Sequence, residues 1–143
     1  GVDGSGVSQK AIEYAFAEAS ARECELIAVH TWMDMQIQAS LAGLSAAQQQ
    51  WKIVEEEQNM LLGHRLAGYA ERYPDVQVTR VVTRDRPVRA LVDAAKGAQL
   101  LVVGSHGRGG FKGMLLGSTS RALLQSAPCP MMVVRPDSDA KAH

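Results

Sequence analysis

The sequence predicts an α/β domain in which a mainly parallel sheet carries helices on both faces. Segments with helical spacing of apolar residues alternate strictly with short, strand-like apolar runs. The 143 residues suit one domain with one core, and 46% hydrophobic and 21% charged residues are ordinary for a globular protein. A glycine-rich segment follows one apolar run, at the sheet edge where such folds bind ligands.

The first half of the chain predicts two helices around one strand. Ser8 is the expected N-cap of a first helix that ends near Arg22, since apolar residues recur on one face between them. Residues 26–32 (LIAVHTW) predict a buried strand. A long helix is expected over residues 46–73, where apolar residues repeat at helical spacing until Pro74 ends it.

The second half continues the alternation of strands and helices. Pro87 in the first turn and Gly97 at the end delimit one helix. The β-branched residues of VQVTRVVT favour a strand before that helix. In chain order we expect a strand over 76–83, a helix over 85–97, a strand over 100–103, a helix over 117–127 and a strand over 130–134.

The opening residues GVDGS resemble the end of a strand that enters a turn. A strand in a parallel sheet needs about five residues, so we expect the start of a first strand to be missing from the sequence as printed. The alternative is that residues 1–6 are a disordered start. Residues 1–136 are expected to form one domain, either alone or as one half of a tandem protein, and residues 137–143 a flexible tail.

The segment VVGSHGRGGFKGMLLGST, residues 102–119, predicts a phosphate-binding loop. Its glycines let backbone N–H groups approach an anion without a Cβ in the way. The helix expected at its end offers unpaired N–H groups and the positive end of the dipole, beside the hydroxyls of Ser118 and Thr119. A plain connecting loop is the alternative, but long loops without secondary structure are uncommon unless functional.

The charge distribution favours an anionic ligand at this loop. The chain has 15 Lys and Arg against 15 Asp and Glu, yet residues 94–136 contain no acidic residue and carry a charge of +5. A local positive field attracts anions, although chance clustering on a solvated face is the alternative. Arg108 and Lys112 are candidates for phosphate contact, with simple solvation as the other reading.

Several familiar site classes are excluded or weak. The chain has no GxxxxGK[ST] motif, and its first turn, VDGSGVS, does not fit the GxGxxG dinucleotide fingerprint. The four histidines lack metal-ligand spacing, and no HExxH or G-x-S-x-G motif is present. Neutral net charge and few aromatic residues argue against nucleic-acid binding. No apolar run of membrane-spanning length and no CxxC motif occur, so we expect a cytoplasmic protein.

Two residues outside the loop are candidates with open alternatives. Asp3 follows the first strand, where it would accept from ribose hydroxyls or hold a metal ion, or would instead bond within the Ser5–Ser8 turn. Val29 lies late in the second strand, where its backbone would face an adenine ring while its side chain serves as ordinary core.

The segments GVDGS, AVH and GSHGRGGFKGMLLGSTS together resemble the universal stress protein family over essentially the whole chain. The most specific element is G-x2-G-x9-G-[ST], with which family members generally bind ATP. The resemblance implies a Rossmann-like three-layer fold with five parallel strands in the order 3-2-1-4-5. It implies that Asp3 contacts ribose or metal, Val29 adenine and Val103 the nucleoside, with Val2, Gly4 and Ser5 alongside. The implied phosphate-binding residues are Gly104, Gly107, Arg108, Gly117, Ser118 and Thr119.

The resemblance implies an ATP-binding regulator of the stress response, with Mg²⁺ or Mn²⁺ accompanying the nucleotide. The alternatives are a slow ATPase or adenylyl-transferring enzyme, and an interaction module without nucleotide. We expect no dedicated catalytic machinery, and at most weak ATP hydrolysis. The resemblance also implies a homodimer or a tandem pairing through the last strand, which comprises Met131, Met132, Val133 and Val134.

Overall fold

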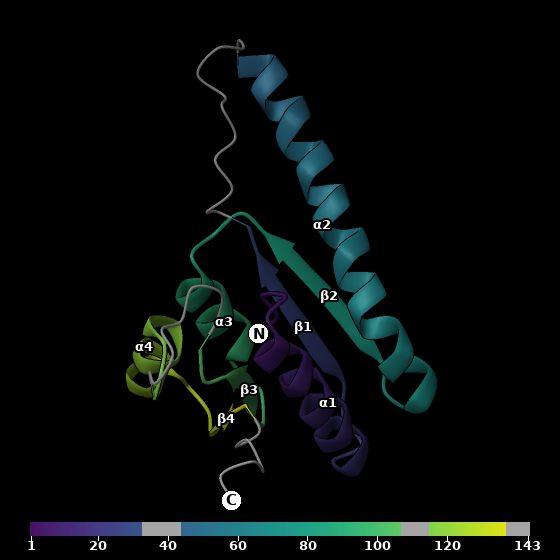
Figure 1. Ribbon diagram of the computed structural model, residues 1–143, viewed down its shortest axis with the longest axis vertical. Coiled ribbons are helices and arrows are strands. Elements are labelled where there is room, and N and C mark those ends of the chain that lie inside the picture. The colour runs from purple at the N-terminus through teal and green to yellow at the C-terminus, as the bar shows by residue number, and fades with distance from the viewer. Residues whose placement is uncertain (33–43, 107–114, 137–143) are drawn as a thin grey trace, which may run out of the picture.

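The computed structural model describes residues 1–32, 44–106 and 115–136, which form an α/β domain (Figure 1). Helices and strands alternate along these residues as the sequence predicts. The elements are α1 (Gly6–Ala21), β1 (Leu26–Thr31), α2 (Leu44–Arg72), β2 (Val78–Thr83), α3 (Pro87–Ala95), β3 (Leu101–Gly104), α4 (Ser118–Ser126) and β4 (Met131–Val134).

The four strands form two parallel pairs. β1 pairs with β2 in the register Leu26 to Val78, and β3 pairs with β4 in the register Leu101 to Met131. In the described residues the sheet is thus two two-stranded parts, and the expected order 3-2-1-4-5 of five strands is not confirmed. Gly1 and Val2 lie between the two parts, because their N–H groups donate to Val102 on β3 and to Val29 on β1.

Apolar side chains gather in two clusters, one on each face of the strands. Val2, Ile12 and Phe16 pack with Leu62 and Leu66, so α1 and α2 cover one face. Figure 1 shows α2 running alongside β2, with its amino-terminal half extending past the strands. The second cluster gathers α3, α4 and the other face of the strands: Val29, Ala90, Leu91, Ala95, Leu101, Val103 and Leu123. The helices therefore lie on both faces, as the alternation of elements predicts.

The first helix begins earlier than predicted. Ser5, not Ser8, is its N-cap, since the Ser5 hydroxyl accepts from the Ser8 N–H at 3.1 Å. The Ser8 hydroxyl instead accepts from the Asp3 N–H at 3.1 Å, and Ser8 is buried. Either serine could cap a helix through its hydroxyl. The turn that follows Val2 places Ser5 at the start of the helix and Ser8 within it.

Other boundaries differ from prediction by one or two residues, with local causes. The third helix spans Pro87–Ala95 and not residues 85–97, because Lys96 is extended and Gly97 has a φ of 79°. Gly97 thus stops this helix in the left-handed region that glycine tolerates. The long helix begins at Leu44, two residues before the predicted start. The connection expected over residues 33–45 lies mostly outside the described residues, as does the tail over 137–143.

Candidate functional site at the carboxyl ends of the strands

The turn between Val2 and α1 is built by local hydrogen bonds. The Asp3 carboxylate accepts from the Ser5 N–H through Oδ1 at 2.8 Å, which is an Asx turn. Gly4 has a φ of 87°, a conformation that a side chain would disfavour. The structure therefore contains the local bond that was the alternative role of Asp3, while Asp3 remains only half-buried.

Val2 joins this turn to β1 and α2. Its N–H donates to the Val29 carbonyl at 2.9 Å, and its own carbonyl accepts from His30 Nδ1 at 2.7 Å. His30 Nε2 lies 2.7 Å from Gln58 Oε1 on α2. The His30 ring thus lies between the turn and the long helix, with the Val2 carbonyl at one ring nitrogen and the Gln58 side chain at the other.

The end of β3 packs closely against the start of α1. A Cβ built on Gly104 would lie 2.8 Å from Cγ1 of Val7. The Gly104 carbonyl accepts from the Ser120 hydroxyl at 2.6 Å, and Ser120 is buried. The packing of α1 against β3 therefore requires glycine at position 104. The Ser120 hydrogen bond joins α4 to the end of the same strand, β3.

The amino end of α4 differs from that of α1 in one respect. Gly117 is its N-cap and supplies no side-chain hydrogen bond, whereas Ser5 caps α1 through its hydroxyl. The Gly117 N–H donates to the Ser105 carbonyl at 2.6 Å, and a Cβ on Gly117 would lie 3.1 Å from the His106 Cα. The first-turn amides of α4 consequently have no capping side chain of their own.

The structure brings most of the predicted site residues to one edge. The turn Val2–Ser5, the β3 end at Gly104 and the α4 start at Gly117 are linked by the contacts above. Ser118 is exposed and Thr119 half-buried at this edge. Val29 and Val103 are both core side chains, at 4% exposure each, and the Val29 carbonyl is bonded to Val2. Gly107, Arg108 and Lys112 lie outside the described residues.

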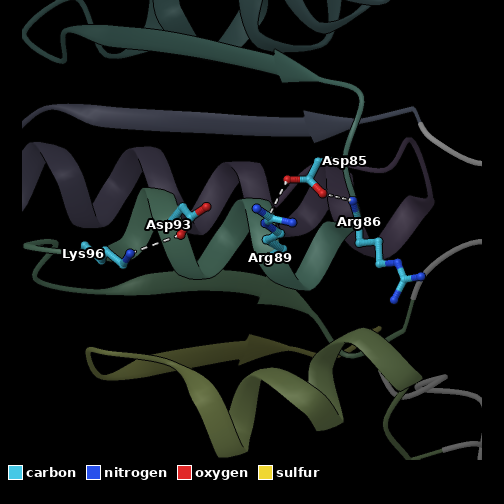
Figure 2. A network of polar contacts seen from close by, with 5 residues as sticks. All are labelled: Asp85, Arg86, Arg89, Asp93 and Lys96. Atoms are coloured by element: carbon cyan, nitrogen blue, oxygen red, sulfur yellow. Dashed lines mark hydrogen bonds and ion pairs between the residues drawn. The ribbon is translucent and has the colours of Figure 1, made fainter.

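The charged residues in and beside α3 bond to one another. Figure 2 shows them as two ion pairs, Asp85 with Arg89 at 3.8 Å and Asp93 with Lys96 at 3.2 Å. Asp85 also accepts from the Arg86 backbone N–H at 2.7 Å just before the helix begins, and the Arg86 side chain extends away from it. Exposed pairs of this kind contribute little to stability.

Residues 1–32, 44–106 and 115–136 show neither a metal-binding cluster nor a membrane-spanning helix. Within them no group of three or more His, Cys, Asp or Glu side chains is placed to hold a metal ion. None of the helices there has the length and apolarity needed to span a membrane.

Sequence reasoning missed the supporting polar residues of the site. Three buried polar side chains hold parts of the site in place. Ser8 bonds to the turn at Asp3, Ser120 bonds to Gly104, and Gln58 contacts His30. The signal for Gln58 was present, because it precedes Leu62 and Leu66 at intervals of four in the apolar stripe of the long helix. A polar residue in an apolar stripe indicates a buried hydrogen bond.

A family model for the universal stress protein family matches residues 1–135. The chain belongs to this family. Universal stress protein Rv2005c of Mycobacterium tuberculosis is 53% identical over 135 residues, which are 94% of this chain and 44% of that protein. A universal stress protein of Mycolicibacterium smegmatis is 51% identical over 136 residues, again 44% of that protein. The chain thus spans less than half the length of these relatives.

Solved structures of universal stress proteins share the fold. UspA from Lactobacillus plantarum superposes with a TM-score of 0.76 at 20% identity, covering 94% of this chain and 93% of that one. A universal stress protein solved in complex with cAMP has a TM-score of 0.59 at 26% identity, covering 94% of this chain and 91% of that one.

Proposed function

We propose that this chain binds ATP, with Mg²⁺ or Mn²⁺, at the edge formed by the Val2–Ser5 turn, Gly104 and the start of α4. The observation that carries the proposal is the glycine N-cap of α4, which has no side chain of its own to bond the first-turn amides. Backbone amides at a helix N-terminus, with the positive end of the dipole behind them, are suited to phosphate oxygens.

The surrounding residues fit a nucleotide with its metal ion. One oxygen of the Asp3 carboxylate accepts from Ser5, and the second is available to a ribose hydroxyl or a divalent cation. No Asp or Glu occurs in residues 94–136, so no carboxylate from that stretch would repel the phosphates. Gly107 and Arg108, the remaining residues of the glycine motif, complete the proposed phosphate site.

One solved relative supports an adenine nucleotide as the ligand. A related universal stress protein has been solved with cAMP, which contains adenine and a phosphate. We propose a cytoplasmic stress-response regulator in which bound nucleotide stabilises one state of the domain, because a ligand that binds only the folded form adds to its stability. We also propose the five-strand order 3-2-1-4-5, with Gly1–Asp3 in the first strand.

Among the described strands β4 pairs with β3 alone, and its other edge supports pairing with a second domain. β4 pairs with β3 on one side, and strand edges of this kind associate with other strands. The relatives are more than twice as long as the matched region. We therefore propose that Met131–Val134 pair with the equivalent strand of a second copy or of a tandem domain.

A proline at the first position of α4 tests whether the backbone amides at the start of this helix bind the phosphates. Proline fits N1 of a helix, and Gly117 before it is extended with ψ 171°, so Ser118→Pro deletes one main-chain donor without disturbing the helix. Ser118→Ala is the matched control, since it removes the hydroxyl and keeps the amide. Calorimetry with MgATP should show affinity weakened about 10-fold or more by Ser118→Pro, equal to ~1.4 kcal/mol, and far less by Ser118→Ala. Equal affinity in the two variants would refute the site.

Single-turnover hydrolysis separates the regulator from the slow ATPase or adenylyl-transferring alternative. Bound ATP that survives purification and incubation supports the regulator. Rapid formation of ADP that requires Asp3 supports the enzyme, with Asp3 as the metal-holding or basic group.

A further inference from the structure

The long helix α2 carries large apolar side chains that do not join the core. Leu62 and Leu66 are buried against the rest of the domain and mark the inner face of the helix. Elsewhere on the same helix, Ile53 is 55% exposed, Met60 66% and Leu61 47%. Exposed apolar side chains that gather on one surface indicate a binding surface for another protein.

These side chains lie on one stripe along the helix. At 3.6 residues per turn, positions three, four or seven apart line up on one face. The stripe formed in this way, here called the outer stripe, is exposed along its whole length and comprises Ile53, Glu57, Met60, Leu61, His64 and Gly68.

The position of α2 leaves the outer stripe open to a partner. The helix spans Leu44–Arg72, and its amino-terminal half extends past the strands (Figure 1). A helix in water gains most of its stability from packing a face against other parts of a protein. A second helix lying on the outer stripe would supply such packing on the side of α2 that the described domain leaves exposed.

We propose that the outer stripe binds the outer stripe of a second copy of this chain, with the two α2 helices antiparallel. The two-fold axis passes between Met60 and Leu61, the apolar midpoint of the stripe. Such an axis brings together positions that lie equally far on either side of the midpoint, and the interface it forms is closed.

The charged residues of the outer stripe favour the antiparallel direction. Glu57 and His64 lie equally far from the midpoint, so Glu57 of one copy meets His64 of the partner subunit, where an imidazole N–H can donate to the carboxylate. The positions three and four residues before and after each of them hold no charged residue, so neither has an ion-pair partner along its own helix. A parallel pair in register would instead place like carboxylates together, which is unfavourable.

The ends of the outer stripe are complementary in size. Ile53 and Gly68 also lie equally far from the midpoint, so the large side chain of one copy meets the open backbone of the other. A Cβ on Gly68 would meet nothing within 4 Å, so packing within the described domain does not require glycine there. Glycine inside a helix costs about 1 kcal/mol relative to alanine, and the partner's isoleucine accounts for its presence. Beyond this pair, exposed Gln50 and Glu71 form a polar rim.

An exchange of charges tests the proposed contact. Glu57→Lys and His64→Glu, each alone, should weaken self-association about 10-fold in sedimentation equilibrium, and the two together should restore it. Restoration cannot come from a pair within one helix, because the two positions are seven residues apart. A double variant that associates no better than the weaker single variant overturns the proposal. An unsubstituted chain that stays monomeric at about 1 mM does so as well.

Met60→Glu gives a second measurement, with Leu124→Glu as the matched control. Leu124 is 54% exposed on α4, so the two changes bury a similar charge only if the helix concerned forms the interface. Met60→Glu should weaken association more than 10-fold, and Leu124→Glu should leave it unchanged. The reverse result, or equal association of Met60→Glu and the unsubstituted chain, overturns the proposal.

Both measurements are independent of the proposed pairing of β4 and of nucleotide binding. α2 packs on β2, whereas β4 belongs to the other two-stranded part of the sheet. If β4 pairs as well, the unsubstituted chain forms tetramers and the α2 variants stop at dimers, so the comparison between variants keeps its meaning.

Discussion

The Ser120 hydroxyl donates a hydrogen bond of 2.6 Å to the Gly104 carbonyl, and so joins the first turn of α4 to the end of β3. Ser120 is 3% exposed. Ser120→Ala leaves this carbonyl without its partner, so we expect a loss of about 1–3 kcal/mol in the free energy of unfolding by urea.

Ser126→Ala is the matched control for this prediction. Ser126 lies on the same helix and donates to the Ala122 carbonyl at 2.8 Å, but in an exposed position where water can replace the bond. Its loss should cost less than about 0.5 kcal/mol. Equal costs for the two alanine variants would contradict the role given to Ser120.

Gly104→Ala should destabilise the domain through overpacking against Val7. The new Cβ would lie 2.8 Å from Val7 Cγ1, and crowding of a packed interior costs about 1–3 kcal/mol. In a Val7→Ala background the same change should cost much less, because the obstructing methyl group is gone. A double-mutant cycle in urea measures this coupling, and additive effects would show that the close approach is not what requires glycine.

The order of elements could be predicted from the sequence because the proline and glycine residues that begin or end helices act locally. Pro74 and Pro87 constrain the backbone by their own rings, and Gly97 at φ 79° ends α3 in a conformation that few other residues adopt. The alternation of elements also predicts where a site would lie, at the carboxyl ends of the strands, and this remains a prediction. These features could be predicted without knowing which segments of the chain contact one another.

Contacts between distant segments could not be predicted in the same way. Whether Ser5 or Ser8 caps α1 depends on the turn at Asp3. Glycine is required at position 104 because Val7, on another element, packs against it. The His30–Gln58 contact joins a strand to a helix 28 residues away. A sequence motif shows where glycine occurs, but only the packed structure shows which neighbouring residue leaves no room for a side chain there.

Asp3→Asn separates the two roles open to Asp3. Asparagine keeps a side-chain oxygen for the Ser5 N–H, now 2.8 Å from Oδ1, and removes the negative charge. We expect the thermal midpoint to change little and MgATP affinity to fall about 10-fold, measured by calorimetry. Asp3→Ala should lose both the turn bond and the affinity. An asparagine variant with full affinity would leave Asp3 with the local role alone.

Gly117→Ala should weaken ATP binding about 10-fold or more, ~1.4 kcal/mol. The new Cβ would lie 3.1 Å from the His106 Cα and 3.5 Å from the Ser105 carbonyl, so the backbone before the glycine-rich segment must shift. Gly68→Ala is the matched control, since a Cβ there meets nothing within 4 Å. Unchanged affinity in calorimetry with Gly117→Ala would refute the assignment of this segment to the phosphates.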